Sequence, residues 1–139
     1  IAITKGKIAD ILAARGELDE ALRIRREDQL PVYERLGEVR EIAITKGKIA
    51  DILFAQHQTL EAIEIYREQV LPVYAQLGDQ RMLMVAQANL AWMLLQSDTD
   101  PSDEPKALLC SALKLAQAMQ LPEAQQITKF LQRFGLRCE

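Results

Sequence analysis

The sequence predicts an all-α protein, built as a right-handed α-solenoid of stacked helix-turn-helix repeats with a C-terminal capping helix. The first observation is an internal repeat: Ile1–Leu12 recurs without change as Ile42–Leu53, at an offset of 41 residues. Self-similarity at a period of 20 to 50 residues is typical of repeat architectures. The other two observations are apolar residues at helical spacing and glycines at matching positions between the helical segments.

The repeat predicts how the chain is organised. Leu30–Tyr33 recurs as Leu71–Tyr74, which extends the match through most of the period. We expect one repeat domain made of a first repeat (1–41), a second (42–82), a degenerate third (83–121) and a capping helix (122–135). Because the first two repeats are so similar and the sequence starts inside a repeat, we expect it to be a fragment of a longer array.

Each repeat is predicted to form two helices. The first helix of repeat one has apolar residues on more than one side, which suits a helix buried on several faces: Ile8, Ala9, Ile11, Leu12 and Ala13. Gly16 ends this helix, and the second runs from about Asp19 to Leu36 with Gly37 as its C-cap. Gly6 and Gly47 lie inside the first helices and indicate close helix packing, with approach of a ligand as the alternative.

Proline recurs inside the second helix at positions 31 and 72. Proline removes a backbone hydrogen bond, so we expect a kink near Gln29 and near Val70. The alternative is that the helix ends there and residues 32–36 form a separate turn.

Two details differ in the later repeats. His57 stands where the first repeat has Gly16, which predicts a less tight turn. In the third repeat, Asp103 or Glu104 is a candidate N-cap before Pro105, followed by a helix over about 106–119. The last helix is predicted from Pro122 to about Phe134, with Gly135 closing it and one apolar stripe: Ile127, Phe130, Leu131 and Phe134.

Composition excludes several function classes. Apolar residues make up 49% and charged residues 27%, with a net charge of −3, so neither a nucleic-acid nor a membrane partner is expected. The segment that starts at Asp98 has Asp103 and Leu109 where a calcium loop has its glycine and its glutamate, and Lys5-Gly6-Lys7 is only a fragment of a phosphate loop. His57 has no nucleophile or acidic partner at catalytic spacing. We therefore expect no metal, no cofactor and no enzyme activity.

The two cysteines, Cys110 and Cys138, are not in a Cys-x-x-Cys motif. We expect two reduced thiols in a cytoplasmic protein, because thiols stay reduced in that compartment. The alternative is a disulfide that ties down the C-terminal tail, as in a secreted protein.

At Ala9, Gly16 and Ala21, and in its helix-turn-helix unit, the chain resembles the tetratricopeptide repeat family. Its units of about 41 residues are similar to the longer repeats of kinesin light chains. A later aromatic position of the family is Arg25 in repeat one and Tyr66 in repeat two. The resemblance implies a scaffold that binds a peptide or protein in a concave groove lined by the first helices. The matching positions here are Lys7, Asp10, Lys48, Asp51, Phe54, Asn89 and Trp92.

The leading interpretation is therefore a protein-protein interaction scaffold. The alternative is an oligomerisation or regulatory sensor arm of a larger signalling protein. Trp92, the only tryptophan, is either a core residue or a binding anchor. Ile1, Ile3 and Ile8 lie at an end without a polar cap, so we also expect self-association there.

Overall fold

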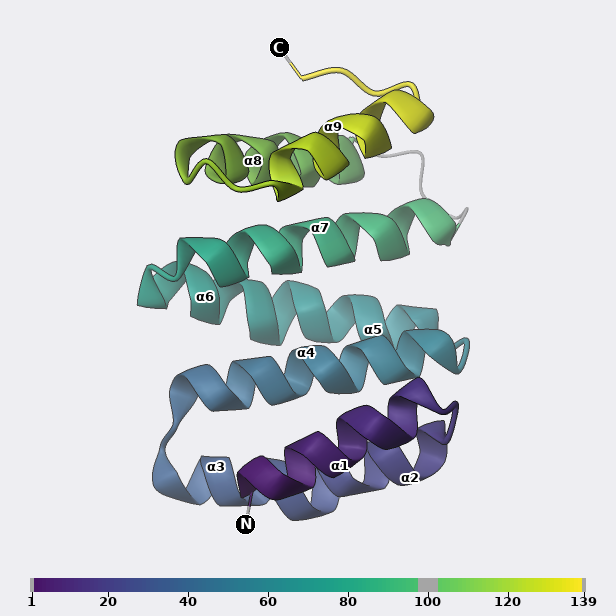
Figure 1. Cartoon of the computed structure of the whole chain (residues 1–139), viewed down its shortest axis with the longest axis vertical. Coiled ribbons are helices and arrows are strands. Elements are labelled where there is room, and N and C mark those ends of the chain that lie inside the picture. Colours follow the sequence, from purple (N-terminus) through teal and green to yellow (C-terminus); the bar gives the residue numbers. More distant parts are fainter. Residues whose placement is uncertain (1, 98–102, 139) are drawn as a thin grey trace. The chain divides into compact units, whose positions relative to one another are not determined.

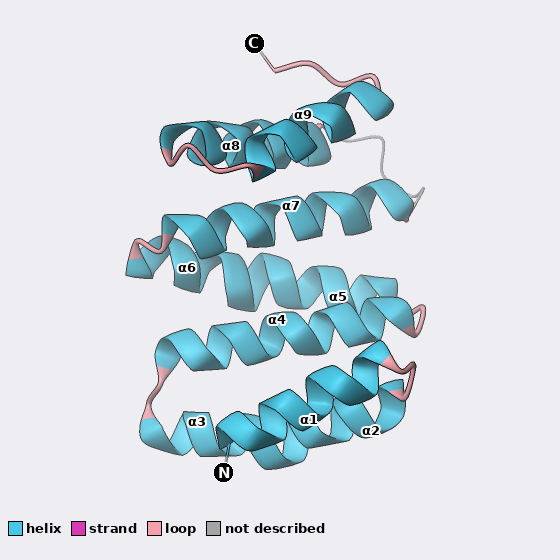
Figure 2. Cartoon of the chain, in the orientation of Figure 1, coloured by secondary structure: helices cyan, strands magenta, loops and turns pink. Residues whose placement is uncertain are grey.

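The computed structural model describes residues 2–97 and 103–138, and throughout this part the regular structure is helical (Figures 1 and 2). The predicted all-α class is confirmed. Ile1 and most of the acidic segment 98–104 lie outside the described residues. The elements are α1 (Ala2–Ala14), α2 (Leu18–Arg23), η1 (Ile24–Gln29), α3 (Leu30–Leu36), α4 (Val39–Ala55), α5 (Thr59–Ile65), η2 (Tyr66–Val70), α6 (Leu71–Leu77), α7 (Gln80–Gln96), α8 (Glu104–Ala118) and α9 (Glu123–Arg133).

The chain divides into two compact units, an N-terminal unit (Ile1–Val73) and a C-terminal unit (Tyr74–Glu139). In the N-terminal unit, α1 packs against α2 and η1 (Figure 1). The helix α4 follows in the chain and contacts α2, η1 and α3. Ala9 and Ala21 are fully buried and belong to one core cluster with Ile24 and Ile52. These small side chains let the paired helices approach closely.

The C-terminal unit is formed by α7, α8 and α9 around a second core cluster: Met84, Ala91, Leu109, Ala112, Ala116, Ile127 and Leu131. The apolar stripe predicted for the last helix is confirmed, because Ile127 and Leu131 are buried and Phe130 packs against the cluster. Its polar residues, including Gln125 and Lys129, are exposed.

The second helix of each of the first two repeats continues through its proline. Just before Leu30-Pro31 the chain forms a π-helix, η1, and Leu30 N–H donates to the carbonyl of Arg25, five residues back. The second repeat does the same, with η2 ahead of Pro72 and Leu71 N–H bonded to Tyr66. Because proline has no N–H, the wider turn provides a bonding pattern that carries the helix up to it. The alternative in which the helix ends there is wrong.

The helix ends are closed by residues with left-handed backbone. Gly16 has φ +82°, and Glu17 N–H donates to the carbonyl of Leu12 at 2.8 Å. His57 has φ +67°, and Gln58 N–H donates to Leu53 over the same 2.8 Å. The prediction of a less tight turn at His57 is wrong, since histidine adopts the glycine conformation and makes the same hydrogen bond.

The two identical segments differ in burial. Ile49 and Ile52 are 4% and 5% exposed, whereas their counterparts Ile8 and Ile11 are 41% and 55% exposed. The prediction of a first helix buried on several sides is right for α4 and wrong for α1. Ile52 packs against α1 and α2 through Ala9 and Ala21, and no described element provides such a surface for Ile11. Ile3, at the N-terminal end of α1, is also exposed.

The prediction of two reduced thiols is wrong, because Cys110 and Cys138 form a disulfide. After α9 the chain reverses at Gly135, which has φ +68°, and runs back toward α8. The Cα atoms of the two cysteines come within 5.5 Å, a separation that a disulfide spans without backbone movement.

Candidate functional site

The first-helix positions singled out in the sequence meet in a charged network in the N-terminal unit. Asp10 of α1 accepts hydrogen bonds from Arg25 Nη2 and from Lys48 Nζ, the latter at 3.1 Å. Arg25 is only 3% exposed, and its Nη1 donates to Gln29 Oε1 at 2.8 Å. The π-helix η1 carries both Arg25 and Gln29 and turns them toward α1.

The electrostatics of Asp10 follow from these partners. Burial opposes its charge, but Lys48 and Arg25 together hold the pKa of its carboxyl below the ordinary value of 3.8. Asp10 therefore stays ionised and neutralises a buried guanidinium. The carboxylate of Asp10 therefore has a structural role, since it pairs with Arg25 of its own repeat and with Lys48 of the second repeat.

Gly6 is explained by the same network. A Cβ at this position would lie 2.5 Å from Gln29 Nε2 and 3.4 Å from Arg25 Nη1. The predicted close packing is thus confirmed at Gly6, where side chains rather than backbone fill the space. At Gly47 a Cβ would lie 3.6 Å from Tyr66 Oη, an ordinary contact.

In the second repeat, the equivalent aspartate has a different partner. Tyr66 Oη donates to Asp51 Oδ1 at 2.7 Å. Desolvation raises the pKa of Asp51, and the hydrogen bond from Tyr66 and the charge of Lys48 only partly oppose this. Among the described residues, no cation lies within ion-pair distance of Asp51. Lys48 therefore acts on this carboxylate only from a distance, and Asp51 itself is exposed.

The structure brings together Asp10, Lys48 and Asp51 among the predicted site residues. Lys7 is exposed on α1, and Phe54 is half-buried at the end of α4. Sequence reasoning did not assign Arg25 and Tyr66 to the site. The available signal was that both occupy the same repeat position, 41 residues apart, and that Arg25 stands where the resembled family has an aromatic, whereas Tyr66 keeps the aromatic and adds a hydroxyl.

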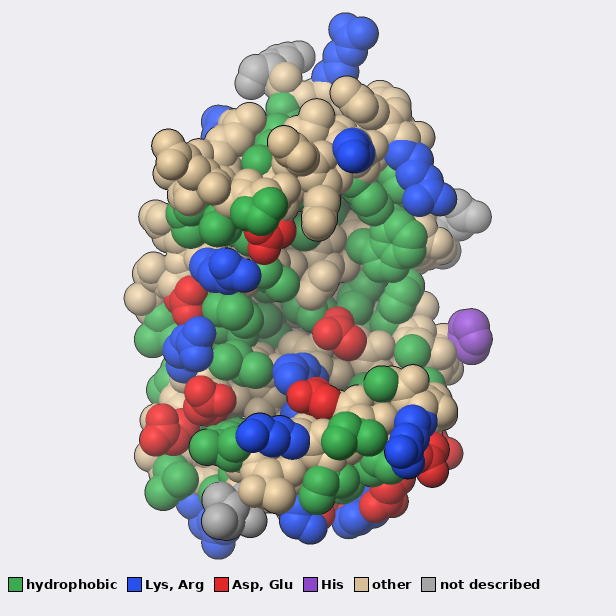
Figure 3. Space-filling model, in the orientation of Figure 1, with side chains coloured by type: hydrophobic (Ala, Val, Ile, Leu, Met, Phe, Trp, Pro, Cys, Tyr) green, Lys and Arg blue, Asp and Glu red, His purple; other side chains and the backbone are tan. Residues whose placement is uncertain are grey.

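The other two predicted residues, Asn89 and Trp92, lie on α7 in the C-terminal unit. Trp92 is 36% exposed, and its ring centroid lies 5.3 Å from that of Phe130, which lies 4.9 Å from Phe134. A cleft of about 240 Å³ opens beside Trp92, with one polar side chain in its lining: Ala88, Trp92, Leu109, Gln126, Ile127 and Phe130. Figure 3 shows hydrophobic surface in the region of α7 and α9.

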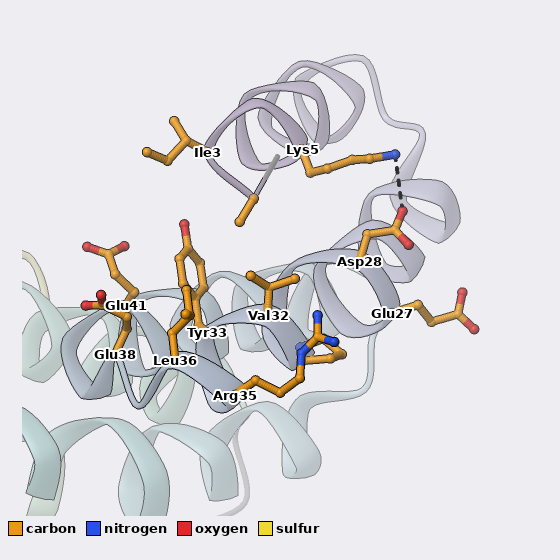
Figure 4. A pocket seen from close by; sticks show the side chains of 12 residues that line it. Ile3, Lys5, Glu27, Asp28, Val32, Tyr33, Arg35, Leu36, Glu38 and Glu41 are labelled. Atoms are coloured by element: carbon orange, nitrogen blue, oxygen red, sulfur yellow. Dashed lines mark ion pairs between the residues drawn. The ribbon is translucent and has the colours of Figure 1, made fainter.

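A larger cavity of about 780 Å³ lies in the N-terminal unit between α1 and α3 (Figure 4). Its apolar side is formed by Ile3 together with Val32, Tyr33 and Leu36, and the Lys5–Asp28 ion pair, at 3.5 Å, lies at its edge. The sequence did not predict this cavity, because its lining comes from residues far apart in the first repeat.

Searches for related proteins found no matching family model and no matching curated protein. Over the described residues, the structure contains no helix long and apolar enough to cross a membrane. The same part of the chain has no group of three or more histidine, cysteine or acidic side chains placed to hold a metal ion.

Proposed function

We propose that this chain is a tetratricopeptide-like α-solenoid that works as a protein-protein interaction scaffold, binding a peptide or protein on its first helices. The observation that carries the proposal is Trp92. It is more than one third exposed, its ring packs at a tilt against Phe130, and it borders an apolar cleft. Tryptophan is enriched among the residues that dominate binding energy, especially next to a pocket that excludes water.

The polar network supports the same proposal. Asp10, Lys48 and Asp51 lie on neighbouring first helices, and hydrogen bonds restrain both carboxylates. A polar surface restrained in this way loses little side-chain entropy when a partner binds. Asp51, whose charge no cation in contact compensates, is the carboxylate best suited to pair with a basic group of the partner.

The test uses a library of random peptides displayed on phage and selected on the full chain. Trp92 is the only tryptophan, so its fluorescence reports a peptide that binds at the cleft. Selected peptides are expected to shift this emission. They should bind Trp92→Ala at least about tenfold more weakly, the effect of losing one anchor residue.

The matched control is Leu60→Ala, which removes an apolar side chain that is 77% exposed on α5. It should leave peptide affinity unchanged. Equal binding to Trp92→Ala and wild type would refute the anchor role. Loss of cooperative unfolding in Trp92→Ala would instead show that Trp92 is a core residue.

A second candidate function, oligomerisation, is favoured by the exposed apolar face of α1. Ile3, Ile8 and Ile11 are 65%, 41% and 55% exposed. The counterparts of the last two on α4, Ile49 and Ile52, are buried. Light scattering across a concentration series should show a dimer that Ile8→Glu and Ile11→Glu together convert to monomer. Leu60→Glu is the control, and a monomeric wild type would exclude this function.

The proposal includes a cytoplasmic location. In that compartment glutathione and thioredoxin keep thiols reduced, so a disulfide between Cys110 and Cys138 would be transient or regulatory. If the disulfide of the purified chain stays intact in millimolar reduced glutathione, that result would contradict this location.

A further inference from the structure

The C-terminal segment 135–138 lies back over the α8–α9 pair as a strap with three attachments. Gly135 and Leu136 close α9, with Leu136 N–H donating to the carbonyl of Leu131 at 2.8 Å. The side chain of Leu136 packs against the core cluster of the C-terminal unit. Beyond it, the disulfide from Cys138 to Cys110 of α8 is the third attachment.

The strap forms one wall of a cavity of about 640 Å³. The opposite walls come from α8 and α9 and include two leucines of the apolar core, one half-buried and one 4% exposed: Leu113 and Leu131. Because the strap supplies half of the lining residues, removing it would take away this wall and expose the apolar surface of Leu113 and Leu131. The cavity lies wholly within the C-terminal unit.

The disulfide is accessible to reductants. Cys138 is exposed and Cys110 is half-buried, so an external thiolate can approach Cys138 without unfolding α8. Exchange requires such access to a sulfur atom, and buried structural disulfides do not provide it.

We propose that the Cys110–Cys138 disulfide is a redox switch that controls whether the strap covers the apolar surface of Leu113 and Leu131. A thiolate of a cellular dithiol attacks Cys138 Sγ, and the disulfide bond breaks as Cys110 leaves as a thiolate and takes up a proton. The second thiol of the dithiol then attacks the mixed disulfide and releases Cys138 as a thiol. Two electrons and two protons pass to the protein, and the dithiol becomes a cyclic disulfide.

Reduction leaves the strap with two main-chain hydrogen bonds, from Gly135 N–H to the carbonyl of Gln132 and from Leu136 N–H to that of Leu131, and with the packing of Leu136. These contacts lie at the start of the strap, so without the disulfide its end frays at a low free-energy cost. The strap then opens from Cys138 back toward Leu136 and uncovers Leu113 and Leu131, and oxidation ties it down again. This switch concerns the C-terminal unit and does not depend on the proposed peptide binding.

The test compares the oxidised full chain with the chain reduced by dithiothreitol, using hydrogen exchange and the apolar dye 1-anilinonaphthalene-8-sulfonate. Reduction should speed amide exchange of Gly135 and Leu136, whose N–H groups are hydrogen-bonded, at least about tenfold and increase dye fluorescence, while α1 to α5 keep their protection. Removing the reductant and adding oxidised glutathione should reverse both changes. Cys138→Ser should give the reduced signals with or without dithiothreitol.

Three results would overturn the switch. The strap could keep its slow exchange after reduction, which would make the disulfide dispensable. The whole C-terminal unit could unfold, which would make the disulfide a structural staple. The disulfide could also stay intact in millimolar reduced glutathione, in which case no cellular thiol pool would operate it. If Cys138→Ser does not fold, reduction and reoxidation of the wild-type chain, followed by the same two measurements, test the switch on their own.

Discussion

The two helical glycines at the same repeat position provide an internal comparison. Replacing either by alanine stabilises the helix itself by about 0.8–1.0 kcal/mol, because alanine loses less backbone entropy on folding. Gly6 and Gly47 lie in identical sequence, from Ile1 to Leu12 and from Ile42 to Leu53. Any difference between the two variants therefore comes from tertiary neighbours.

Those neighbours differ. At Gly47 the added Cβ meets Tyr66 Oη at 3.6 Å, so Gly47→Ala should gain most of the helix term, up to about 1 kcal/mol. At Gly6 the Cβ would lie 2.5 Å from Gln29 Nε2, so Gln29 must move. Gln29 is 5% exposed and accepts a hydrogen bond from the charged Arg25, worth about 1.5–3 kcal/mol. Subtracting the helix term, Gly6→Ala should destabilise by roughly 0.5–2 kcal/mol.

Urea unfolding followed by circular dichroism measures both changes as shifts of the transition midpoint. The expected result is opposite signs, with Gly47→Ala more stable than wild type and Gly6→Ala less stable. The same Gly6→Ala change should be made in a Gln29→Ala background, where the clash with the glutamine side chain is absent. There it should lower the free energy of unfolding less than it does in the wild-type chain. Equal shifts for the two glycines would refute the assignment of Gly6 to close packing.

The remaining predictions concern the left-handed turn and the two aspartates. His57→Gly should stabilise the protein by about 1 kcal/mol, because glycine adopts φ +67° without the Cβ penalty, and Gly16→His should cost a similar amount in the same melting assay. The pKa of Asp51 is raised, so the native state holds its proton more tightly than the unfolded state, and stability falls as pH rises from 3.8 through the folded pKa. Asp51→Asn removes this effect and should be more stable than wild type at pH 7, with the gap closing toward pH 3. The pKa of Asp10 is lowered, so its contribution is present above 3.8 and is lost as pH falls through the folded pKa. Asp10→Asn should destabilise by about 1–3 kcal/mol at pH 7, because buried Arg25 loses its carboxylate, and the same sign for both asparagine variants in urea titrations at pH 7 would contradict this reasoning.

Local signals in the sequence were sufficient to predict the helices. Gly37 and Gly135 end helices with left-handed backbone, as their positions after apolar segments indicated. Pro105 lies in the first turn of α8, which begins at Glu104, and Asp103 is at its N-cap. These features depend on a few neighbouring residues, and backbone sterics at glycine and proline are the same in any fold.

Features that depend on distant residues were not predictable in the same way. Proline at 31 and at 72 indicated a disturbed helix, but the local sequence did not show that the disturbance is a π-helix or that it turns Arg25 and Gln29 toward α1. The disulfide needed the chain reversal at Gly135 to bring Cys138 to α8. Burial of the identical segments differs because their surroundings differ, which no pattern within the segment can report.

The two aspartates show how one repeat position acquires two chemical characters. Asp10 and Asp51 have identical neighbours from nine residues before them to two residues after them. One residue that sets their charge state lies 15 positions later, on the π-helix, where the first repeat has Arg25 and the second has Tyr66. Arginine adds a full positive charge to that of Lys48 beside Asp10, whereas tyrosine gives Asp51 one neutral hydrogen bond, and desolvation then dominates. Tyrosine in place of arginine, outside the first helix, thus removes one of the two cations that hold such a carboxylate ionised, and Asp51 is left with no cation in contact among the described residues.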